Sequence, residues 1–344
     1  MAADGWTPLH AQIHRTLKQR PLLPPGQLLL LAVSGGQDSL CLAKLLLDLQ
    51  PKWRWQLAIA HCDHRWREDS AANARHVQQL AATWQLPYYA HTATAPPPTE
   101  AAARDWRYES LLAIAQQIGA TAIVTGHTAS DRAETLLFNL VRGSGMDGLQ
   151  ALGWARALTP KIQLVRPLLA ITRSQTAQFC QDLALPVWDD ATNRDRHYRR
   201  NRLRLDVVPL LQTHFNPNVE AALAQAAEIL QAEVAYLDTL TTQLYEQTVV
   251  IEPLNPERAI ARIERTALRT APLALQRRVC RRLLQQCLSS QPNFDHVEKL
   301  VCLLDAPNRT QTDPFPGGAI AQVERNWILV QPILNQTPGQ PPPL

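Results

Sequence analysis

Residues 34–39 read Ser-Gly-Gly-Gln-Asp-Ser and combine two glycines, two hydroxyls and one carboxylate in six positions. An apolar run at 28–33 precedes them and a helical pattern follows, so the segment joins a strand to a helix. Backbone N–H groups at such a junction, together with the positive end of the helix, bind phosphate. Ser34 and Ser39 can add hydroxyl donors. We therefore interpret residues 34–39 as a phosphate loop.

Asp38 is the unusual member of this loop, because a carboxylate repels phosphate unless a cation bridges the two. Mg²⁺ is the natural bridge, so Asp38 is predicted to be a metal ligand. The chain has no Gly-Lys pair, which excludes a Walker A loop, and no G-x-G-x-x-G for a dinucleotide. The alternative is a sharp turn that needs glycine, with Ser39 or Asp38 capping the helix.

A second pair of carboxylates, Asp131 and Glu134, follows His127 in the segment GHTASDRAET. On a helix, residues three apart share a face, so the two charges repel each other modestly. Such a pair can bind a cation. Alternatively, Asp131 is the N-cap of the helix and Glu134 its N3 residue in a near capping box. Since His127 ends a strand at the expected ligand edge, the cation-binding interpretation is favoured.

The elements that must position these residues alternate along the first two thirds of the chain. Strand, helix, strand in this order predicts an α/β fold, a doubly wound parallel sheet that binds ligands at the carboxyl ends of its strands. The predicted strands are 28–33, 55–61, 88–91, 122–126 and 164–169, and the predicted helices are 38–49, 69–85, 100–118, 131–142 and 172–184.

The pattern changes after residue 215. Apolar residues at steps of three and four predict one amphipathic helix over 219–248, which fits a helix bridging to a second domain or a coiled-coil homodimer. More helix is expected to about 304, then a hairpin at 319–330. We expect a catalytic domain at 1–215, a smaller, mostly helical domain at 216–332, and a disordered proline-rich tail at 333–344.

Arginine is unevenly distributed although the net charge is only +4. Residues 192–205 hold six arginines against one aspartate, and residues 257–284 hold eight against two glutamates. Each cluster fits an ordinary solvated helix face, but two of them favour a nucleic acid partner. Six cysteines without a C-x-x-C pair, no signal pattern and no membrane span predict a cytoplasmic protein with reduced thiols.

Six motifs in order resemble the tRNA(Ile)-lysidine synthetase family. The phosphate loop is similar to the pyrophosphatase-type loop of ATP enzymes that release pyrophosphate and attach AMP to a substrate oxygen. The others are HCDHRWREDS (61–70), RDWRYESL (104–111), GHTASDRAET (126–135), RGSGMDGL (142–149) and DDATNRDRHYRRNRLR (189–204). The resemblance is dense from about 25 to 215. It departs at Ser130, where the family often has an acid.

This resemblance implies an adenine nucleotide alpha hydrolase-like fold and an enzyme that joins free L-lysine to C2 of the wobble cytidine in an isoleucine tRNA with a CAU anticodon. The substrates would be ATP, with Mg²⁺, lysine and the tRNA. Implied ATP-binding residues are Ser34, Gly35, Gly36, Gln37, Asp38 and Ser39. Implied catalytic residues are Asp38, His127 and Asp131. Implied lysine- or tRNA-binding residues are Asp63, Arg67, Arg104, Arg107, Glu134, Arg142, Arg200 and Asn201.

Three other interpretations remain open. A tRNA thiolase shares the loop but needs reactive cysteines or an iron–sulfur cluster, and neither Cys41 nor Cys62 has a partner cysteine nearby. His61, Asp63 and His64 could suggest zinc, but no fourth ligand is spaced for it. A nucleotide-regulated RNA-binding protein without catalysis would use the loop as a sensor. Release of pyrophosphate separates enzyme from sensor.

Overall fold

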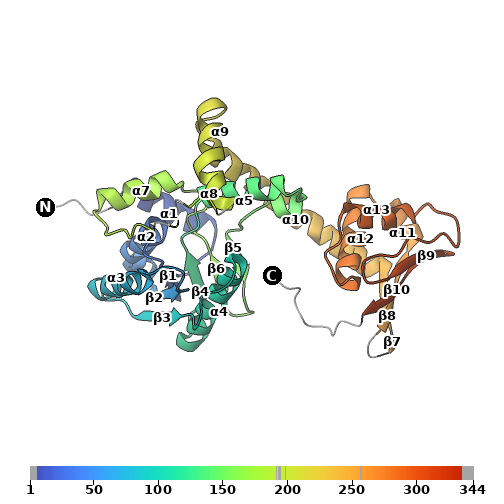
Figure 1. Ribbon diagram of the computed structural model, residues 1–344, viewed down its shortest axis with the longest axis horizontal. Helices are drawn as coiled ribbons and strands as arrows, with labels where there is room; N and C mark the ends of the chain where they lie inside the picture. Colours follow the sequence, from blue (N-terminus) through green and yellow to red (C-terminus); the bar gives the residue numbers. More distant parts are fainter. Residues whose placement is uncertain (1–5, 191, 193–194, 198, 256–257, 335–344) are drawn as a thin grey trace. The chain divides into compact units, whose positions relative to one another are not determined.

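The computed structural model describes residues 6–190, 192, 195–197, 199–255 and 258–334 (Figure 1). The chain divides into two compact units, Met1–Gln231 and Ala232–Leu344. The division lies inside helix α10 (Val219–Thr248), whereas the boundary expected from the sequence precedes that helix. The long amphipathic helix itself is confirmed. Within the described residues, no helix combines the length and the hydropathy needed to cross a membrane.

The first unit is built on a six-stranded sheet in the order β3-β2-β1-β4-β6-β5. Five strands are parallel, and the short edge strand β5 is antiparallel to β6. The chain winds outward from β1 in both directions, so the predicted doubly wound sheet is confirmed. The strands are β1 (Leu28–Ala32), β2 (Gln56–Asp63), β3 (Tyr88–Thr92), β4 (Ala122–Thr125), β5 (Ala155–Ala157) and β6 (Gln163–Val165).

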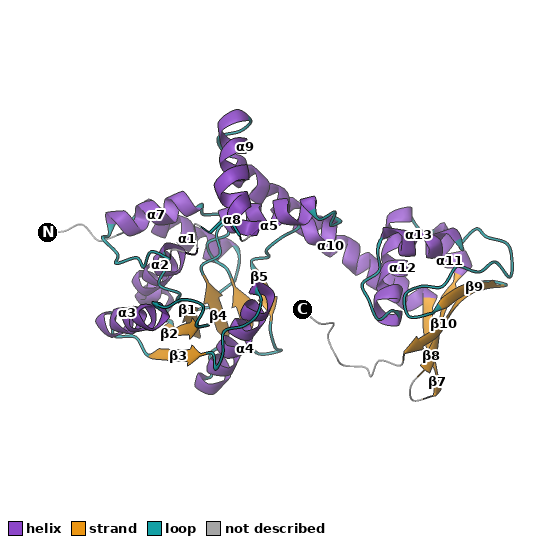
Figure 2. Ribbon diagram, in the orientation of Figure 1, coloured by secondary structure: helices purple, strands orange, loops and turns teal. Residues whose placement is uncertain are grey.

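Helices cover both faces of this sheet because β1 is apolar on both sides (Figure 2). Leu29 and Leu31 belong to one buried cluster with residues of α2, and Leu30 belongs to another with residues of α4. The helices are α1 (Pro8–Gln19), α2 (Gln37–Trp53), α3 (Ser70–Thr83), α4 (Glu100–Ile118), α5 (Ala129–Val141), α6 (Met146–Leu149), α7 (Arg173–Asp182), α8 (Arg199–Arg202), η2 (Leu203–Val207, a π-helix) and α9 (Val208–His214).

The second unit packs three helices on a four-stranded antiparallel sheet, β7-β8-β10-β9. The predicted hairpin at 319–330 is confirmed by β9 (Ile320–Glu324) and β10 (Trp327–Leu334). The prediction of helix through 249–264 is wrong, because β7 (Val249–Asn255) and β8 (Arg258–Glu264) occupy it. In β8, buried Ala261 and Ile263 alternate with Arg262, a period of two. The helices are α11 (Arg265–Thr270), α12 (Leu273–Cys287) and α13 (Phe294–Cys302).

The expected proline-rich tail at 333–344 lies outside the described residues from 335 onward. Its first two residues, 333 and 334, belong to β10.

Candidate active site

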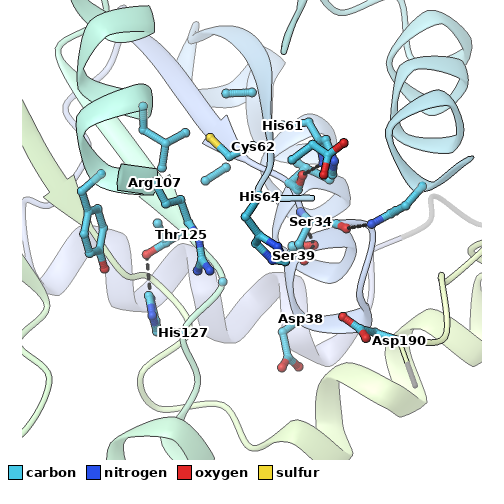
Figure 3. A pocket seen from close by; sticks show the side chains of 18 of the residues that line it. Ser34, Asp38, Ser39, His61, Cys62, His64, Arg107, Thr125, His127 and Asp190 are labelled. Carbon is cyan, nitrogen blue, oxygen red and sulfur yellow. Dashed lines mark hydrogen bonds between the residues drawn. The ribbon is translucent and has the colours of Figure 1, made fainter. Parts of the chain in front are cut away.

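A cavity of about 360 Å³ lies at the carboxyl edge of the parallel sheet, where the segments after β1, β2 and β4 meet. Figure 3 shows Asp38 and Ser39 of the phosphate loop, His61 near the end of β2, His64 directly after it, and His127 after β4 around this space. These segments are far apart in the sequence. Residues of 104–111 and 189–204 line it as well, so the fold brings five of the six predicted motifs to one cavity, at the edge where such sheets bind ligands.

The phosphate loop is held by its own hydroxyls. Ser39 Oγ donates to the carbonyl of Gly36 at 2.8 Å, and the N–H of Ser34 donates to Ser39 Oγ at 3.2 Å. Gly36 is the N-cap of α2 and makes no side-chain cap bond, so neither Ser39 nor Asp38 is the N-cap. The backbone N–H groups at the start of α2 thus remain available for an anion.

Two glycines are required by close approaches in and beside this loop. Gly35 has φ +90°, and a Cβ there would lie 2.5 Å from Asn73 Oδ1. A Cβ at Gly126 would lie 2.8 Å from the backbone oxygen of Asp38. The loop is also fixed from outside, because Asn73 Nδ2 donates to the carbonyl of Ser34 at 3.0 Å. No sequence motif pointed to Asn73.

Three carboxylates, Asp38, Asp131 and Glu134, form a cluster around one guanidinium that the sequence did not reveal. Arg173, the first residue of α7, donates from Nε to Asp38 Oδ2 at 3.0 Å. Its Nη2 donates to Asp131 Oδ1 at 2.9 Å, and its Nη1 donates to Glu134 Oε1 at 3.2 Å. We call these three acids the carboxylate cluster. Only tertiary structure could find Arg173, since it lies outside the six motifs.

A second arginine, Arg204, holds Glu134 in the cluster. Its Nε donates to Oε1 at 2.7 Å and its Nη2 to Oε2 at 2.9 Å, a bidentate pair. Glu134 is only 3 % exposed, and two guanidiniums compensate its buried charge. Arg204 is the last arginine of the sixth motif, so its type and position were visible in the sequence although its role was not.

The start of α5 differs from the capping arrangement considered above. The N-cap is Thr128 and Asp131 is the N3 residue, so Asp131 as N-cap is wrong by three positions. Asp131 Oδ2 accepts from the N–H and the hydroxyl of Thr128, both at 2.8 Å, in a complete capping box. Ser130, which departs from the family pattern, is buried and accepts the N–H of Arg173 at 3.0 Å.

The charges of the site follow from these contacts. Burial alone would raise the pKa of Asp131, but Arg173, His127 and the bonds from Thr128 hold that pKa below its usual value.

Burial lowers the pKa of His127 to about 4. Asp131 opposes this shift, and Arg166, Arg107 and Arg200 add to it. His127 is therefore a neutral imidazole at pH 7, in hydrogen-bond contact with Thr125 Oγ1 at 2.9 Å.

The predicted residues at the end of β2 and after it also lie at the cavity. Asp63 is buried, and its Oδ1 accepts the N–H of Arg65 at 2.8 Å. Arg67 joins this segment to the sixth motif through Asp190, with Nη1 2.6 Å from Oδ2. Arg107 lines the cavity as well. Among the described residues, no group of three or more His, Cys, Asp or Glu side chains is arranged to hold a metal ion.

Eight predicted residues are not among those that line the cavity: Arg104, Arg142, Arg200, Asn201, Glu134, Gly35, Gly36 and Gln37. The first three are exposed, and Arg142 stacks on Phe138 at 5.2 Å. Asn201 is buried and donates to the carbonyls of Thr192 and Asp195, both at 2.8 Å, which indicates a structural role. Residues 191, 193, 194 and 198 of the sixth motif lie outside the described residues.

Three arginines of α12 contact side chains of the second unit. Arg277 makes a bidentate pair with Glu298 at 2.7 and 3.0 Å. Arg278 lies 3.4 Å from Asp238, and Arg282 donates to Thr242 Oγ1 at 2.8 Å. Glu257, at the start of this cluster, lies outside the described residues.

The cysteines near the site are Cys41 and Cys180, which are buried, and Cys62, which is half-buried. Burial raises the pKa of Cys62, which lines the cavity, to about 12, and that of Cys180 to about 12. Burial also raises the pKa of the Cys41 thiol. At neutral pH these thiols are protonated, and a protonated thiol is a poor nucleophile. The geometry gives no support to the thiolase interpretation.

Comparisons with known proteins agree with the motifs. One family model, described as a PP-loop domain, matches residues 7–211, and another, described as TilS substrate binding domain, matches residues 264–328. The tRNA(Ile)-lysidine synthase of Nostoc sp. is 59% identical over 333 residues, covering 95% of this chain and 97% of the relative. The chloroplastic tRNA(Ile)-lysidine synthase of Zygnema circumcarinatum is 34% identical, covering 87% and 81%.

A solved structure shows the same fold at low identity. The U34-tRNA thiolase NcsA from Methanococcus maripaludis aligns with a TM-score of 0.55 at 15% identity, covering 65% of this chain and 80% of that one. At this identity the likeness supports the fold of the sheet domain and carries no statement about chemistry.

Proposed function

This chain belongs to the tRNA(Ile)-lysidine synthase family of ATP-dependent ligases, and we propose that it joins lysine to C2 of the wobble cytidine in an isoleucine tRNA with a CAU anticodon. A pyrimidine C2 oxygen is a poor leaving group. The reaction therefore needs two steps, adenylation of that oxygen and then its displacement by an amine.

In the first step, the C2 oxygen attacks the α-phosphorus of ATP, a new O–P bond forms, and pyrophosphate leaves. The N–H groups at the start of α2 would bind the phosphates, and the hydroxyls of Ser34 and Ser39 would donate to them by exchanging the bonds that they make within the loop. The hard carboxylate oxygens of Asp38, within this loop, fit a Mg²⁺ ion that is held by one carboxylate and substrate phosphates. The bound metal would neutralise charge on the leaving pyrophosphate.

In the second step, a lysine amine attacks C2, the C2–N bond forms, and the C2–O bond breaks to release AMP with the oxygen. Asp131 and Glu134 would bind an ammonium group of lysine. The attacking ε-amine must be neutral, so it is a different group from the α-ammonium that the carboxylates would hold, and desolvation of this amine at the reacting carbon favours its neutral form. Neutral His127, charged only below about pH 4, can accept a proton from the nitrogen as the bond forms. Arg107 and Arg67 would contact the anionic substrate groups.

The observation that supports this proposal most is the meeting of the phosphate loop, the HxDH segment and the Asp131–Glu134 helix in one cavity. The test is to incubate the protein with ATP, Mg²⁺, isotope-labelled lysine and the tRNA, and to analyse tRNA nucleosides by mass spectrometry. We expect the lysine label on one cytidine, with AMP and pyrophosphate as the other products. Formation of ADP, or of a sulfur-containing nucleoside, would refute the proposal.

A further inference from the structure

The guanidinium of Arg173 occupies the carboxylate cluster, where the proposed function places Mg²⁺ and the lysine ammonium. Each of its three nitrogens donates to a different member of the carboxylate cluster, at 2.9 to 3.2 Å. The cluster is the set of acids to which the proposed function assigns Mg²⁺ and the lysine ammonium. Arg173 has no part in that assignment, so its position raises the question of what happens to it when substrates bind.

Arg173 occupies one oxygen of each acid in the carboxylate cluster. Asp131 Oδ2 is used by Thr128 in the capping box, which leaves Oδ1 for Arg173. Both oxygens of Glu134 accept from Arg204, and Oε1 accepts from Arg173 as well. An ammonium group bound to Asp131 Oδ1 and Glu134 Oε1 would stand where the guanidinium now stands. The two cations therefore compete for one place.

The contact of Arg173 with Asp38 shows where its guanidinium can move when it leaves the ammonium position. Asp38 belongs to the phosphate loop, so the guanidinium already reaches the carboxylate beside which the ATP phosphates would lie. Its side chain is 27% exposed and lines the cavity. Guanidinium groups bind phosphate oxygens in bidentate geometry, with strong charge-assisted hydrogen bonds. The phosphate oxygens of a triphosphate bound in the loop would accept hydrogen bonds from Arg173 after a change of its side-chain rotamer.

The backbone of Arg173 need not move for this change of rotamer. Its N–H donates to Ser130 Oγ, and its carbonyl accepts from Gln37 Nε2 at 2.9 Å. It lies in the first turn of α7, whose N-cap is Thr172. The backbone of Arg173 is thus held in place between the phosphate loop and α5, and its side chain can change rotamer without moving the backbone.

We propose that Arg173 couples the two small-molecule sites. Without nucleotide, its guanidinium occupies the lysine ammonium position in the carboxylate cluster. When ATP binds, the guanidinium turns to the phosphates and leaves Asp131 and Glu134 with one positive neighbour, Arg204. The ammonium of lysine then takes the vacated position. Lysine binding therefore depends on bound nucleotide, which prevents the amine from occupying the site before the adenylating reagent is present.

This inference rests on the proposed function, and binding measurements without tRNA test it. Lysine affinity is measured by calorimetry with and without Mg²⁺ and an ATP analogue whose α–β bridge is a methylene group, so that no pyrophosphate is released. For the wild type, we expect the analogue to tighten lysine binding about tenfold or more, in the range of ordinary coupling between sites. By linkage, lysine must tighten analogue binding by the same factor.

Arg173→Gln removes the competing charge and provides the decisive comparison. We expect this variant to bind lysine equally well with and without the analogue, and more tightly than the wild type when no analogue is present. Its affinity for the analogue should fall. Arg15→Gln, an exposed site on α1, is the matched charge control and should keep the wild-type coupling. Arg173→Lys tests geometry, since a point charge without the planar fork should couple more weakly.

Two results would overturn the inference. Wild-type lysine affinity that does not respond to the analogue is one. An Arg173→Gln protein that folds, as judged by its thermal transition, but binds lysine more weakly than the wild type in both states is the other, because Arg173 would then support the lysine site. If the wild type forms lysidine and shows no coupling, this inference alone fails. If no lysidine forms, the proposed function fails.

Discussion

Arg132 Nη1 donates to Glu228 Oε2 at 2.7 Å and so joins α5 to α10. Arg132 lies in α5 between Asp131 and Glu134, is 1% exposed, and reaches the first half of α10. Glu228 also accepts from Trp154 Nε1 at 2.6 Å. This pair of a buried guanidinium and a half-buried carboxylate holds the helix that carries two of the three cluster acids.

Loss of Glu228 is predicted to destabilise the first unit. Glu228→Ala leaves the guanidinium of Arg132 buried without its counter-ion, which costs about 3–5 kcal/mol of unfolding free energy. Glu228→Gln keeps an acceptor and should cost less. Denaturant unfolding measures both, with Glu233→Gln, an exposed site of the same helix, as the control. An unfolding free energy of Glu228→Ala within about 0.5 kcal/mol of the wild type contradicts the prediction.

Asp38→Asn is predicted to lower the rate of pyrophosphate release by about 100-fold or more, because the metal bridge to the phosphates is lost. The loop should persist, since its shape depends on Ser34, Ser39 and Gly35. The measurement is pyrophosphate release across a Mg²⁺ titration, with unfolding as the check on the fold. A rate like that of the wild type would leave Asp38 without a catalytic role.

Asp131→Asn and Glu134→Gln are predicted to impair lysine transfer more than adenylation. Each removes a charge that attracts an ammonium, and neither acid touches the phosphate loop in the structure except through Arg173. Pyrophosphate release and labelled lysine incorporation are measured separately. Equal loss in both half-reactions would indicate a metal-binding or structural role instead.

The imidazole of His127 is predicted to titrate at about pH 4 in the folded protein, against 6.5 as its ordinary value. The unfolded chain therefore binds one more proton between these values, so this residue lowers the stability as the pH falls from about 6.5 to about 4. NMR titration of labelled histidine measures the pKa directly. His127→Gln should make stability less dependent on pH in that window. A His127 pKa near 6.5 contradicts the burial seen here.

The arginines of α12 give a prediction about the tRNA. If Arg277 contacts a phosphate, Arg277→Gln should weaken tRNA binding and lower the log–log salt slope by about 1. Glu298 competes for the same guanidinium, so Glu298→Gln should strengthen binding. Titrations at several salt concentrations decide. Unchanged affinity and slope in both variants would leave the pair with a structural role in the second unit.

The sheet and the loop were accessible from the sequence because their patterns are local. Buried strands are short apolar runs, and the phosphate loop is six consecutive residues. The contacts that complete the site join distant parts of the chain. Arg173 meets Asp38 across 135 positions and Glu134 across 39, and no spacing rule reports such a pair.

The strands β7 and β8 of the second unit were not predicted from the sequence, for a different reason. The alternation in β8 is short and contains two arginines, so it resembles the polar face of a helix as much as a strand. Its pairing with β7 and β10 decides the outcome, and pairing is a property of the whole sheet.

The two oxygens of Asp131 make separate contacts, and this affects the affinity of the site for a cation. Thr128 holds Oδ2 with two hydrogen bonds, so the carboxylate plane cannot rotate and Oδ1 already points at the ligand position. A cation that binds there does not have to freeze this side chain, and the entropy of that rotor was lost when the helix formed. Glutamate at 131 would keep the charge, yet its extra methylene cannot cap α5 and hold the same oxygen still.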